Sequence, residues 1–492
     1  MGSSSLRTPH HPRFRPSGLA LALGFWAANA SVALAERPSP DPKAGRTAYV
    51  AQCARCHGDQ AKGDGLDAKR FYPRPRDLTL GVYKFRSTAS GTPPSDDDLF
   101  HTISTGLPGT NMPDWQHLDE ATRWQLVEYL KSLSPVFQEN PPAAVPVSPD
   151  PGARAADLAK GKGLYEQLGC AACHGAAGRA NGTSAAGLVD DWGMPIRPAN
   201  LTQGWSYRGG DSAQAIMLRI RTGIDGAGMP SYADAVSPED TWHLAYYVAS
   251  LQEPPHWNMV AHAARIDGEL PAALDDPRWK QAEPTMVQLR NAVTAEGEWQ
   301  APSTVRMLTM RALENGTAIS VRLSWDDPTE DLSASSADGA QAGRQAEPDA
   351  LAMLLQPAGT SGDVVTLQAW PRPDGPRLDL TYWSAAAPQP VEALAADFAA
   401  VRAGVAGGVP RWSEAKYEDG RWHLIVQRPL APEQPAGAKA ITGDGFEPVA
   451  FTVWDGGNPP APAGEGQPPG QARAVSPWID LALTRRKKTA QH

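Results

Sequence analysis

The chain has 492 residues, a length typical of about three domains, and 41% of them are hydrophobic, which excludes a polytopic membrane protein. Its formal net charge of −9 argues against nucleic acid as a partner, because nucleic-acid-binding surfaces are basic. An acidic surface permits association with a basic partner, and it is equally typical of a solvated exterior.

The first 35 residues have the pattern of a secretory signal peptide. Arg7, Arg13 and Arg15 precede the apolar stretch SGLALALGFWAANASVALA, which ends in a small-x-small site before Glu36. Cleavage after Ala35 removes three arginines and no acidic residue, so the net charge becomes −12. The alternative is an uncleaved N-terminal anchor. No later stretch approaches the roughly 18 apolar residues of a spanning helix, so we expect an exported, periplasmic protein without an integral span.

All of the cysteines belong to two C-x-x-C-H strings, CARCH and CAACH, which leaves none for a structural disulfide. Their cysteines and histidines are Cys53, Cys56, His57, Cys170, Cys173 and His174. One such string is the attachment signature of a c-type haem, but it also occurs as a thiol redox pair or in a zinc site. On one helical turn, two thiols reach the two vinyl groups of a porphyrin, and the adjoining imidazole points at the iron.

The same module occurs twice. Cys53 and Cys170 are 117 residues apart, as are Met112 and Met229, and the segments RPRDLT and ISTGLPG match RPANLT and IRTGIDG. A Met-Pro pair at the same distance from both strings indicates two covalently bound haem c groups. Their axial ligands are then His57 with Met112 and His174 with Met229, and such ligation raises the reduction potential. Methionine as core filler is the alternative, and Met194 is a weaker candidate because the first module has no counterpart.

Further residues are candidates for the surroundings of each haem. A ligating histidine usually donates its second ring N–H to an acceptor, for which the carbonyls of Pro75 and Pro198 are expected. Arginines that follow the attachment strings are candidates for the haem propionates, and aromatic residues three places after each methionine for the haem edge. These are Arg74, Arg86, Arg197, Arg208, Trp115 and Tyr232. Surface arginines and packing aromatics without a haem contact are the alternative.

The first half of the chain resembles class I cytochrome c from about residue 40 to 253. The resemblance lies in the attachment strings, the methionine loops, and the closing segments DEATRWQLVEYLKSL and PEDTWHLAYYVASL, whose apolar residues recur at helical spacing. It implies two all-α domains, at 36–137 and 157–253, that bury a porphyrin and leave one edge exposed. A Pro/Ala-rich linker, 138–156, separates them.

The texture changes from about residue 263. Short β-type runs such as AISVRLSW and WHLIVQRPL, separated by turn signals, predict an all-β antiparallel sandwich at 263–484. A Gly/Ala/Ser/Gln-rich stretch from Ser333 to Pro348 predicts a loop. The basic residues RRKK begin a tail at 485–492, which is either solvated or used in docking.

This region resembles the haem-b-binding subunit domain of ethylbenzene-dehydrogenase-type enzymes, through IDGELPAALDDPRWKQA, VRLSWDDPTED, FTVWDGGN and RAVSPWIDL. The resemblance implies a b-type haem between a methionine and a lysine. Here the methionine loop reads AGTSGDV, and Arg473 occupies the lysine position, where a permanently protonated guanidinium is unsuited to ligate iron. Met353 or Met310 are possible replacements, but the departures favour a docking domain without haem b.

The combination predicts a periplasmic di-haem electron-transfer protein rather than an enzyme. The resemblance implies the cytochrome subunit of a molybdenum-dependent oxidoreductase of the DMSO-reductase type, in a complex with catalytic and iron–sulfur subunits and in exchange with another electron carrier. A free-standing electron shuttle is the alternative. A di-haem peroxidase is a further one, although that chemistry requires an iron with an open position.

Overall fold

The computed structural model describes residues 39, 41–71, 73–185, 188–191, 193, 196–254, 260–291, 303–332, 348–355, 377–395, 413–431, 440–441, 446–456 and 473–483. The predicted signal peptide, Met194, the predicted loop at 333–347, the segment AGTSGDV and the basic tail lie outside these described residues.

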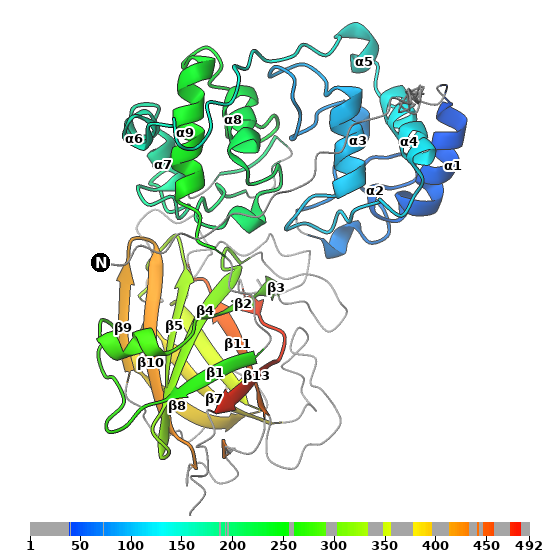
Figure 1. Cartoon of the computed structure of the whole chain (residues 1–492). Helices are drawn as coiled ribbons and strands as arrows, with labels where there is room; N and C mark the ends of the chain where they lie inside the picture. The colour runs from blue at the N-terminus through cyan, green and yellow to red at the C-terminus, as the bar shows by residue number, and fades with distance from the viewer. Residues whose placement is uncertain are drawn as a thin grey trace, which may run out of the picture. The chain divides into compact units, whose positions relative to one another are not determined.

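The region of the two repeats is helical (Figure 1). In the first module the helices are α1 (Pro42–Gln52), α2 (Ala54–His57), α3 (Asp96–Thr105), α4 (Glu120–Ser132) and α5 (Val136–Glu139). In the second they are α6 (Leu158–Gln167), α7 (Cys170–His174), α8 (Ala213–Thr222) and α9 (Pro238–Ser250). The order long helix, attachment helix, loop helix, closing helix is therefore the same in both, as the sequence repeat predicts.

Glycines allow the first and last helices of each module to cross in close contact. A Cβ atom at Gly45 of α1 would collide with the carbonyl oxygen of Gln125 in α4. At the equivalent crossing, a Cβ atom at Gly161 of α6 would collide with the carbonyl oxygen of His243 in α9. The missing side chain thus lets the two backbones approach, which fixes the frame that holds each attachment helix.

The linker between the modules is attached to the second one. Arg221 Nε donates to the carbonyl oxygen of Pro146 at 3.0 Å, and Trp242 Nε1 donates to that of Ser148, also at 3.0 Å. These bonds hold the proline-rich chain along α8 and α9.

The C-terminal region forms one large sheet, with no α-helix among its described residues. Its strands are β1 (Val260–Arg265), β2 (Thr285–Gln288), β3 (Arg290–Asn291), β4 (Met307–Glu314), β5 (Ala318–Asp326), β6 (Ala350–Leu355), β7 (Leu378–Ser384), β8 (Ala387–Ala395), β9 (Ser413–Glu418), β10 (Arg421–Pro429), β11 (Phe446–Trp454), β12 (Arg473–Val475) and β13 (Ile479–Leu483). The main order is β8-β7-β6-β11-β13-β1-β4-β5-β10-β9.

The prediction of a purely antiparallel sheet is wrong at β1. This strand pairs in parallel with β13 on one side and with β4 on the other, so the sheet is mixed. The other pairings are antiparallel, including the long ladder between β5 and β10. A single strand from the start of the domain, inserted between two later ones, accounts for both parallel contacts.

Three tryptophans form the centre of the domain's core. Trp325, Trp383 and Trp422 are each at most 3% exposed, and their ring centroids lie 5.1 to 6.3 Å apart. Trp325 of β5 and Trp422 of β10 are opposite each other in one ladder, whereas Trp383 belongs to β7, near the other end of the sheet order, so the cluster joins two distant parts of the sheet. Aromatic pairs at this separation contribute about 0.5–1.5 kcal/mol each beyond the area that they bury.

His423 in β10 is expected to make the stability of this domain depend on pH. Burial and the positive charges of Arg322 and Arg421 lower the pKa of His423 to about 4, and its Nδ1 is buried without a hydrogen-bond partner. Between pH 6.5 and 4 the unfolded chain therefore binds the proton more readily. Because the ring is partly open to solvent, which screens its charge, the free energy of unfolding should fall by only about 1–2 kcal/mol over that window. Urea titrations at pH 7 and 4.5 measure the change in the free energy of unfolding. In His423→Gln this change with pH should be smaller by the share that the histidine contributes. If the free energy of unfolding of His423→Gln changes with pH as much as that of the native protein, His423 is not the source of the pH dependence.

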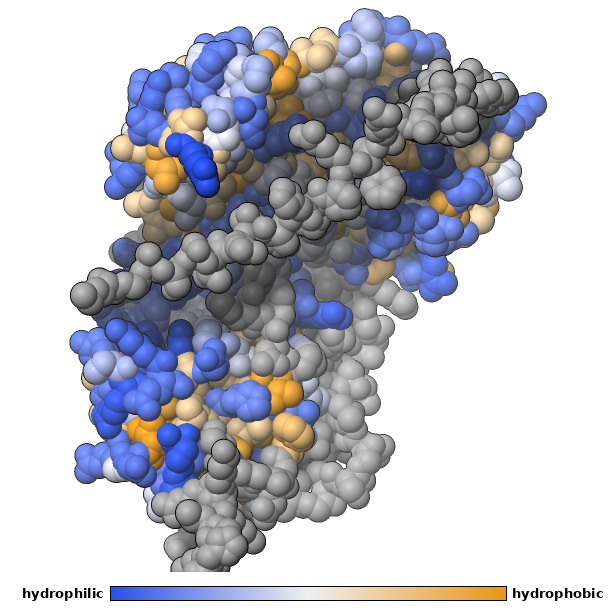
Figure 2. Space-filling view, viewed as in Figure 1, coloured by the Kyte–Doolittle hydropathy of each residue, from blue (hydrophilic) through white to orange (hydrophobic). Residues whose placement is uncertain are grey.

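Within the described residues, no helix has both the length and the apolar composition that crossing a membrane requires. On the face drawn in Figure 2 the described residues are mainly hydrophilic, with hydrophobic side chains in small scattered groups.

Candidate haem-attachment sites

In the first module, both thiols and the imidazole lie on one short turn of helix. Cys53 ends α1, and the amide of His57 donates to its carbonyl oxygen at 2.9 Å. Gly58 then ends α2 with a φ of +83°, a conformation that favours glycine. The thiols of Cys53 and Cys56 are free, and burial raises the pKa of Cys53 to about 12.

The second module repeats this arrangement. Helix α7 runs from Cys170 to His174 and ends at Gly175, whose φ is +78°. The thiols of Cys170 and Cys173 are free, and burial raises the pKa of Cys170 to about 11. The structure thus brings together the same three groups twice, in the order that the sequence predicts.

A backbone carbonyl orients each histidine ring. His57 Nδ1 lies 3.3 Å from the carbonyl oxygen of Arg76, and His174 Nδ1 lies 2.8 Å from that of Ala199. The predicted acceptors, Pro75 and Pro198, are therefore wrong by one residue in each module. An Nδ1–H that donates to a carbonyl leaves Nε2 available as a ligand. In the first module the Pro75 carbonyl instead faces the backbone at Gly63.

The two methionine loops close in the same way. Leu107 N donates to the carbonyl oxygen of Met112 at 3.1 Å, and Ile224 N donates to that of Met229 at 3.0 Å. Each loop begins at a glycine with positive φ after α3 or α8, and both methionines are partly buried. The shared hydrogen bond gives each methionine an equivalent backbone position in its module, which a methionine that only fills the core does not require.

Trp115 and Tyr232 occupy equivalent places after these loops. Trp115 N donates to the carbonyl oxygen of Ile103 at 3.2 Å, and Tyr232 N donates to that of Ile220 at 3.0 Å. Burial and the nearby thiols of Cys170 and Cys173 raise the pKa of Tyr232, so this ring lies beside the second attachment helix.

Orphaned polar atoms in the first module fit a haem. Trp115 Nε1 and Tyr83 Oη are both buried and have no hydrogen-bond partner. Buried donors are normally satisfied, and a haem propionate is an acceptor of the required kind. Together with two thiols, an imidazole and a thioether, these donors form a set that suits a covalently bound haem. Sequence reasoning missed Tyr83, which has no matching tyrosine in the aligned segment of the second module.

Two tyrosines also escaped sequence reasoning, although the repeat contains them. Tyr49 Oη donates to the carbonyl oxygen of Gly58, and Tyr165 Oη donates to that of Gly175, both at 2.7 Å. Each tyrosine is 1% exposed and stands about one helical turn before its attachment string. They hold the end of each attachment helix against the preceding long helix.

The structure assigns Arg86 a different role from the predicted propionate contact. Its guanidinium is buried and lies 2.7 Å from a carboxylate oxygen of Asp225 in the other module. It also donates to the carbonyl oxygens of Thr222, Tyr83 and Ala89 at 3.2, 3.3 and 3.4 Å. Arg86 therefore links the two modules. Of the other candidates, Arg74 is exposed, and Arg197 and Arg208 are partly buried.

Replacing Arg86 with methionine should lower the free energy of unfolding of the helical region by about 2–4 kcal/mol. The variant removes the ion pair with Asp225, whose carboxylate keeps the donors Ser90 Oγ and Gly91 N, and it removes the Arg86 donor from the carbonyls of Thr222 and Tyr83. Lost bonds of this kind are costly in buried positions. Urea denaturation followed by far-ultraviolet circular dichroism measures the loss. Arg46→Met, at an exposed position of α1, is the control and should change stability by less than about 0.5 kcal/mol. If Arg86→Met and Arg46→Met change the free energy of unfolding equally, Arg86 does not stabilise the contact between the two modules.

Comparison with known proteins agrees with this geometry. Residues 40–130 and 156–248 match the family described as cytochrome c oxidase, cbb3-type, subunit III, and residues 276–410 match the family described as ethylbenzene dehydrogenase. The chain thus carries two cytochrome c domains of the cbb3 type, followed by a domain of the ethylbenzene dehydrogenase type.

Two curated relatives are cbb3-type cytochrome c oxidase subunits CcoP. That of Azospirillum sp. (strain B510) is 31% identical over 216 residues, and that of Azospirillum brasilense is 30% identical over 213. Each match covers 42% of this chain and 61% of the relative, so the chain spans about three fifths of their length. A chain of the reducing HAO-like protein complex of Kuenenia stuttgartiensis is 41% identical, with a TM-score of 0.42, and the match covers 44% of this chain and 100% of that one.

The cytochrome c domains imply covalently bound haem c and electron transfer as the activity of this region.

Proposed function

We propose that the protein is a di-haem c-type electron carrier with one haem in each helical domain, at residues 36–137 and 157–253. The first haem is held by Cys53, Cys56, His57 and Met112. The second is held by the equivalent residues Cys170, Cys173, His174 and Met229. The observation that carries the proposal is the duplicated geometry, in which a carbonyl orients each imidazole and the same backbone hydrogen bond closes each methionine loop.

In each domain, different residues bind the haem covalently, coordinate its iron and orient the imidazole. The thiols tether the group covalently, and the imidazole is fixed by its Nδ1 contact. The thioether would supply the second protein ligand, which would leave no place for substrate at the iron and favours electron transfer over peroxidase chemistry. When bound, each haem supplies a one-electron Fe(III)/Fe(II) couple. Trp115 Nε1 and Tyr83 Oη are the donors in the first domain that a propionate would satisfy.

A pyridine haemochrome spectrum of the purified protein, with protein determination, tests the proposal directly. We expect two haem c groups per chain and no haem b. A haem b is not assigned because Arg473, buried in β12 at the place of the expected lysine, carries a protonated guanidinium that is unsuited to ligate iron. A colourless protein, or one haem c per chain, contradicts the di-haem assignment. An additional haem b contradicts only the interpretation of the C-terminal domain.

We further propose that the protein acts in the periplasm. The basic start, the apolar stretch and the small-x-small site of residues 1–35 support export. Covalent haem c in an exported chain also agrees with the use of all cysteines in the attachment strings. N-terminal sequencing of the mature protein should begin at Glu36. A protein that retains Met1 contradicts cleavage.

The proposed partner is a molybdenum-dependent oxidoreductase of the DMSO-reductase type with its iron–sulfur subunit. Support comes from the ethylbenzene dehydrogenase-type domain, which would dock on the catalytic subunits while the cytochrome domains exchange electrons with another carrier. Affinity purification from the native cells at moderate salt, with molybdenum analysis, tests this. Co-purification of a molybdoenzyme supports the proposal, and recovery as a lone monomer favours the free-standing shuttle.

A further inference from the structure

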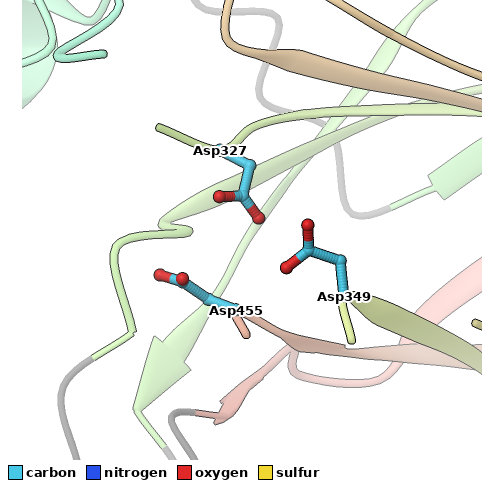
Figure 3. Close-up of side chains that lie close together, drawn as sticks. All are labelled: Asp327, Asp349 and Asp455. Carbon is cyan, nitrogen blue, oxygen red and sulfur yellow. The ribbon is translucent and has the colours of Figure 1, made fainter. Parts of the chain in front are cut away.

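Three buried aspartates meet at one end of the C-terminal sheet, far from the candidate haem ligands in sequence. Asp327 directly follows β5, Asp349 directly precedes β6, and Asp455 directly follows β11. Asp327 and Asp349 are 0% exposed, and Asp455 is 3% exposed. A carboxylate oxygen of each lies within 4.8 Å of the others, and Figure 3 shows the three side chains gathered together.

Backbone and indole donors hold the central carboxylate. Asp349 Oδ1 accepts a hydrogen bond from Gly456 N at 2.8 Å. Its Oδ2 accepts from Trp422 Nε1 and from Asp331 N, both at 2.9 Å. Three donors orient this group, so the cluster has a defined geometry rather than a set of loose side chains.

The other two carboxylates are each satisfied at only one oxygen. Asp327 Oδ1 accepts from Thr329 N at 3.2 Å, and Asp455 Oδ2 accepts from Thr304 N at 3.0 Å and from the Thr304 hydroxyl. The second oxygens, Asp327 Oδ2 and Asp455 Oδ1, are buried and have no hydrogen-bond partner. Buried polar atoms without a partner are rare in native proteins, and each requires an explanation.

The described part of the chain supplies no cationic side chain that compensates this charge. Among the described residues, no lysine or arginine forms an ion pair with Asp327, Asp349 or Asp455, and Asp331 adds a further acidic group beside them. Burial and the mutual proximity of these carboxylates raise the pKa of Asp327. Ionised carboxylates that are buried together are stable only when a cation or a proton offsets their charge.

We propose that Asp327, Asp349 and Asp455 form a calcium site that cross-links the C-terminal sheet. Calcium takes oxygen ligands at about 2.3–2.6 Å in flexible geometry, so two such ligands can lie up to about 5.2 Å apart, and the separations within this cluster fall inside that limit. Magnesium keeps several waters and is usually held by one or two carboxylates, so three buried carboxylates favour calcium. The two orphaned oxygens then become ligands, which accounts for their lack of hydrogen-bond partners.

The cation would join strands that the sheet itself does not pair. β6 and β11 are neighbours, with Ala350 opposite Trp454, whereas β5 lies on the far side of β13, β1 and β4. Calcium bound at this end therefore connects the turn after β5 to the neighbouring ends of β6 and β11. Its expected consequence is stability, because an ion that binds only the folded state shifts the unfolding equilibrium by mass action.

The test uses the full mature chain, stripped with EGTA and freed of the chelator. Isothermal titration with calcium chloride should give one site per chain. In differential scanning calorimetry, calcium at about 100 times its dissociation constant should raise the melting temperature of one transition by about 5–10 °C. Magnesium at the same concentration should give a much smaller rise. Elemental analysis of the untreated protein should find calcium.

Asp327→Asn and Asp455→Asn test the ligands. Each variant should bind calcium at least about tenfold more weakly and lose the calcium-dependent rise. In EGTA each should melt at or above the stripped native protein, because one buried like charge is removed. This result separates a lost ligand from a misfolded domain. Asp419→Asn is the matched control, since this aspartate is exposed and asparagine tolerates its φ of +50°.

Three outcomes overturn the proposal. If the stripped native protein neither binds millimolar calcium nor changes its melting temperature with it, the carboxyl groups hold protons only. An equal response to magnesium overturns the choice of calcium, and a full calcium response in Asp327→Asn overturns the ligand assignment. If both variants fail to fold, the titration and calorimetry of the native chain alone decide the question.

Discussion

Replacing Cys170 and Cys173 with alanine should reduce the covalently bound haem from two groups to one. Without thiols on α7 no thioether can form, while the first attachment helix keeps both of its own. Haemochrome quantification and intact-protein mass spectrometry should both show the loss of one group per chain. This double variant should retain the Soret absorbance of the haem in the first domain, at about half the intensity of the native protein.

The repeat supplies a matched control for this experiment. Cys53→Ala with Cys56→Ala should give the same stoichiometry and leave the second haem in place. The two double variants should differ in the reduction potential of the haem that remains. This difference assigns each redox wave of the native protein to its domain. Two haems in either double variant would show that the C-x-x-C-H strings do not attach them, and the proposed function would be lost with that result.

Apolar periodicity and repeated spacing were sufficient to predict the helical domains. The closing segments were expected as helices, and the structure has them as α4 and α9. The same alignment placed the thiols, imidazoles and methionines in equivalent positions, because all of these lie on local turns whose geometry is set within a few residues. Local patterns of this kind are visible in a single sequence.

Contacts between distant segments were not visible in the same way. The histidine acceptors were displaced by one residue, since the direction of a carbonyl depends on how the loop packs. Arg86 was assigned to a propionate because its partner, Asp225, lies 139 positions away in the other domain. The parallel strand β1 was missed for a similar reason, because nothing near residues 260–265 indicates where the strand inserts.

The aspartate cluster illustrates the same limit. Asp327, Asp349 and Asp455 stand in three unrelated stretches, and each alone is typical of a turn that follows or precedes a strand. Only the fold brings their carboxylates within 4.8 Å of one another. Sequence patterns therefore predict the helices of the two modules, whereas the arrangement of these aspartates depends on the tertiary structure of the C-terminal domain.

Replacing Met229 with alanine should lower the reduction potential of one haem and remove its weak far-red charge-transfer band. The thioether stabilises the reduced iron, so its loss should shift that potential by on the order of 0.1–0.3 V, within the span of about 0.8 V that axial ligands cover. The hydrogen bond from Ile224 N to the Met229 carbonyl does not involve the side chain, so the loop should keep its fold. Spectroelectrochemical titration of the full chain measures the shift.

The specificity of this effect distinguishes a ligand from a packing residue. Met112→Ala should shift the other redox wave by a similar amount and leave the first unchanged. Met217→Leu is the control, because Met217 of α8 is 3% exposed in the core of the same domain and has no proposed contact with iron. If Met217→Leu and Met229→Ala move the potential equally, the shift reflects repacking of the domain. If neither Met112→Ala nor Met229→Ala alters the far-red band, the axial assignments are wrong, although covalent attachment through the cysteines would still hold.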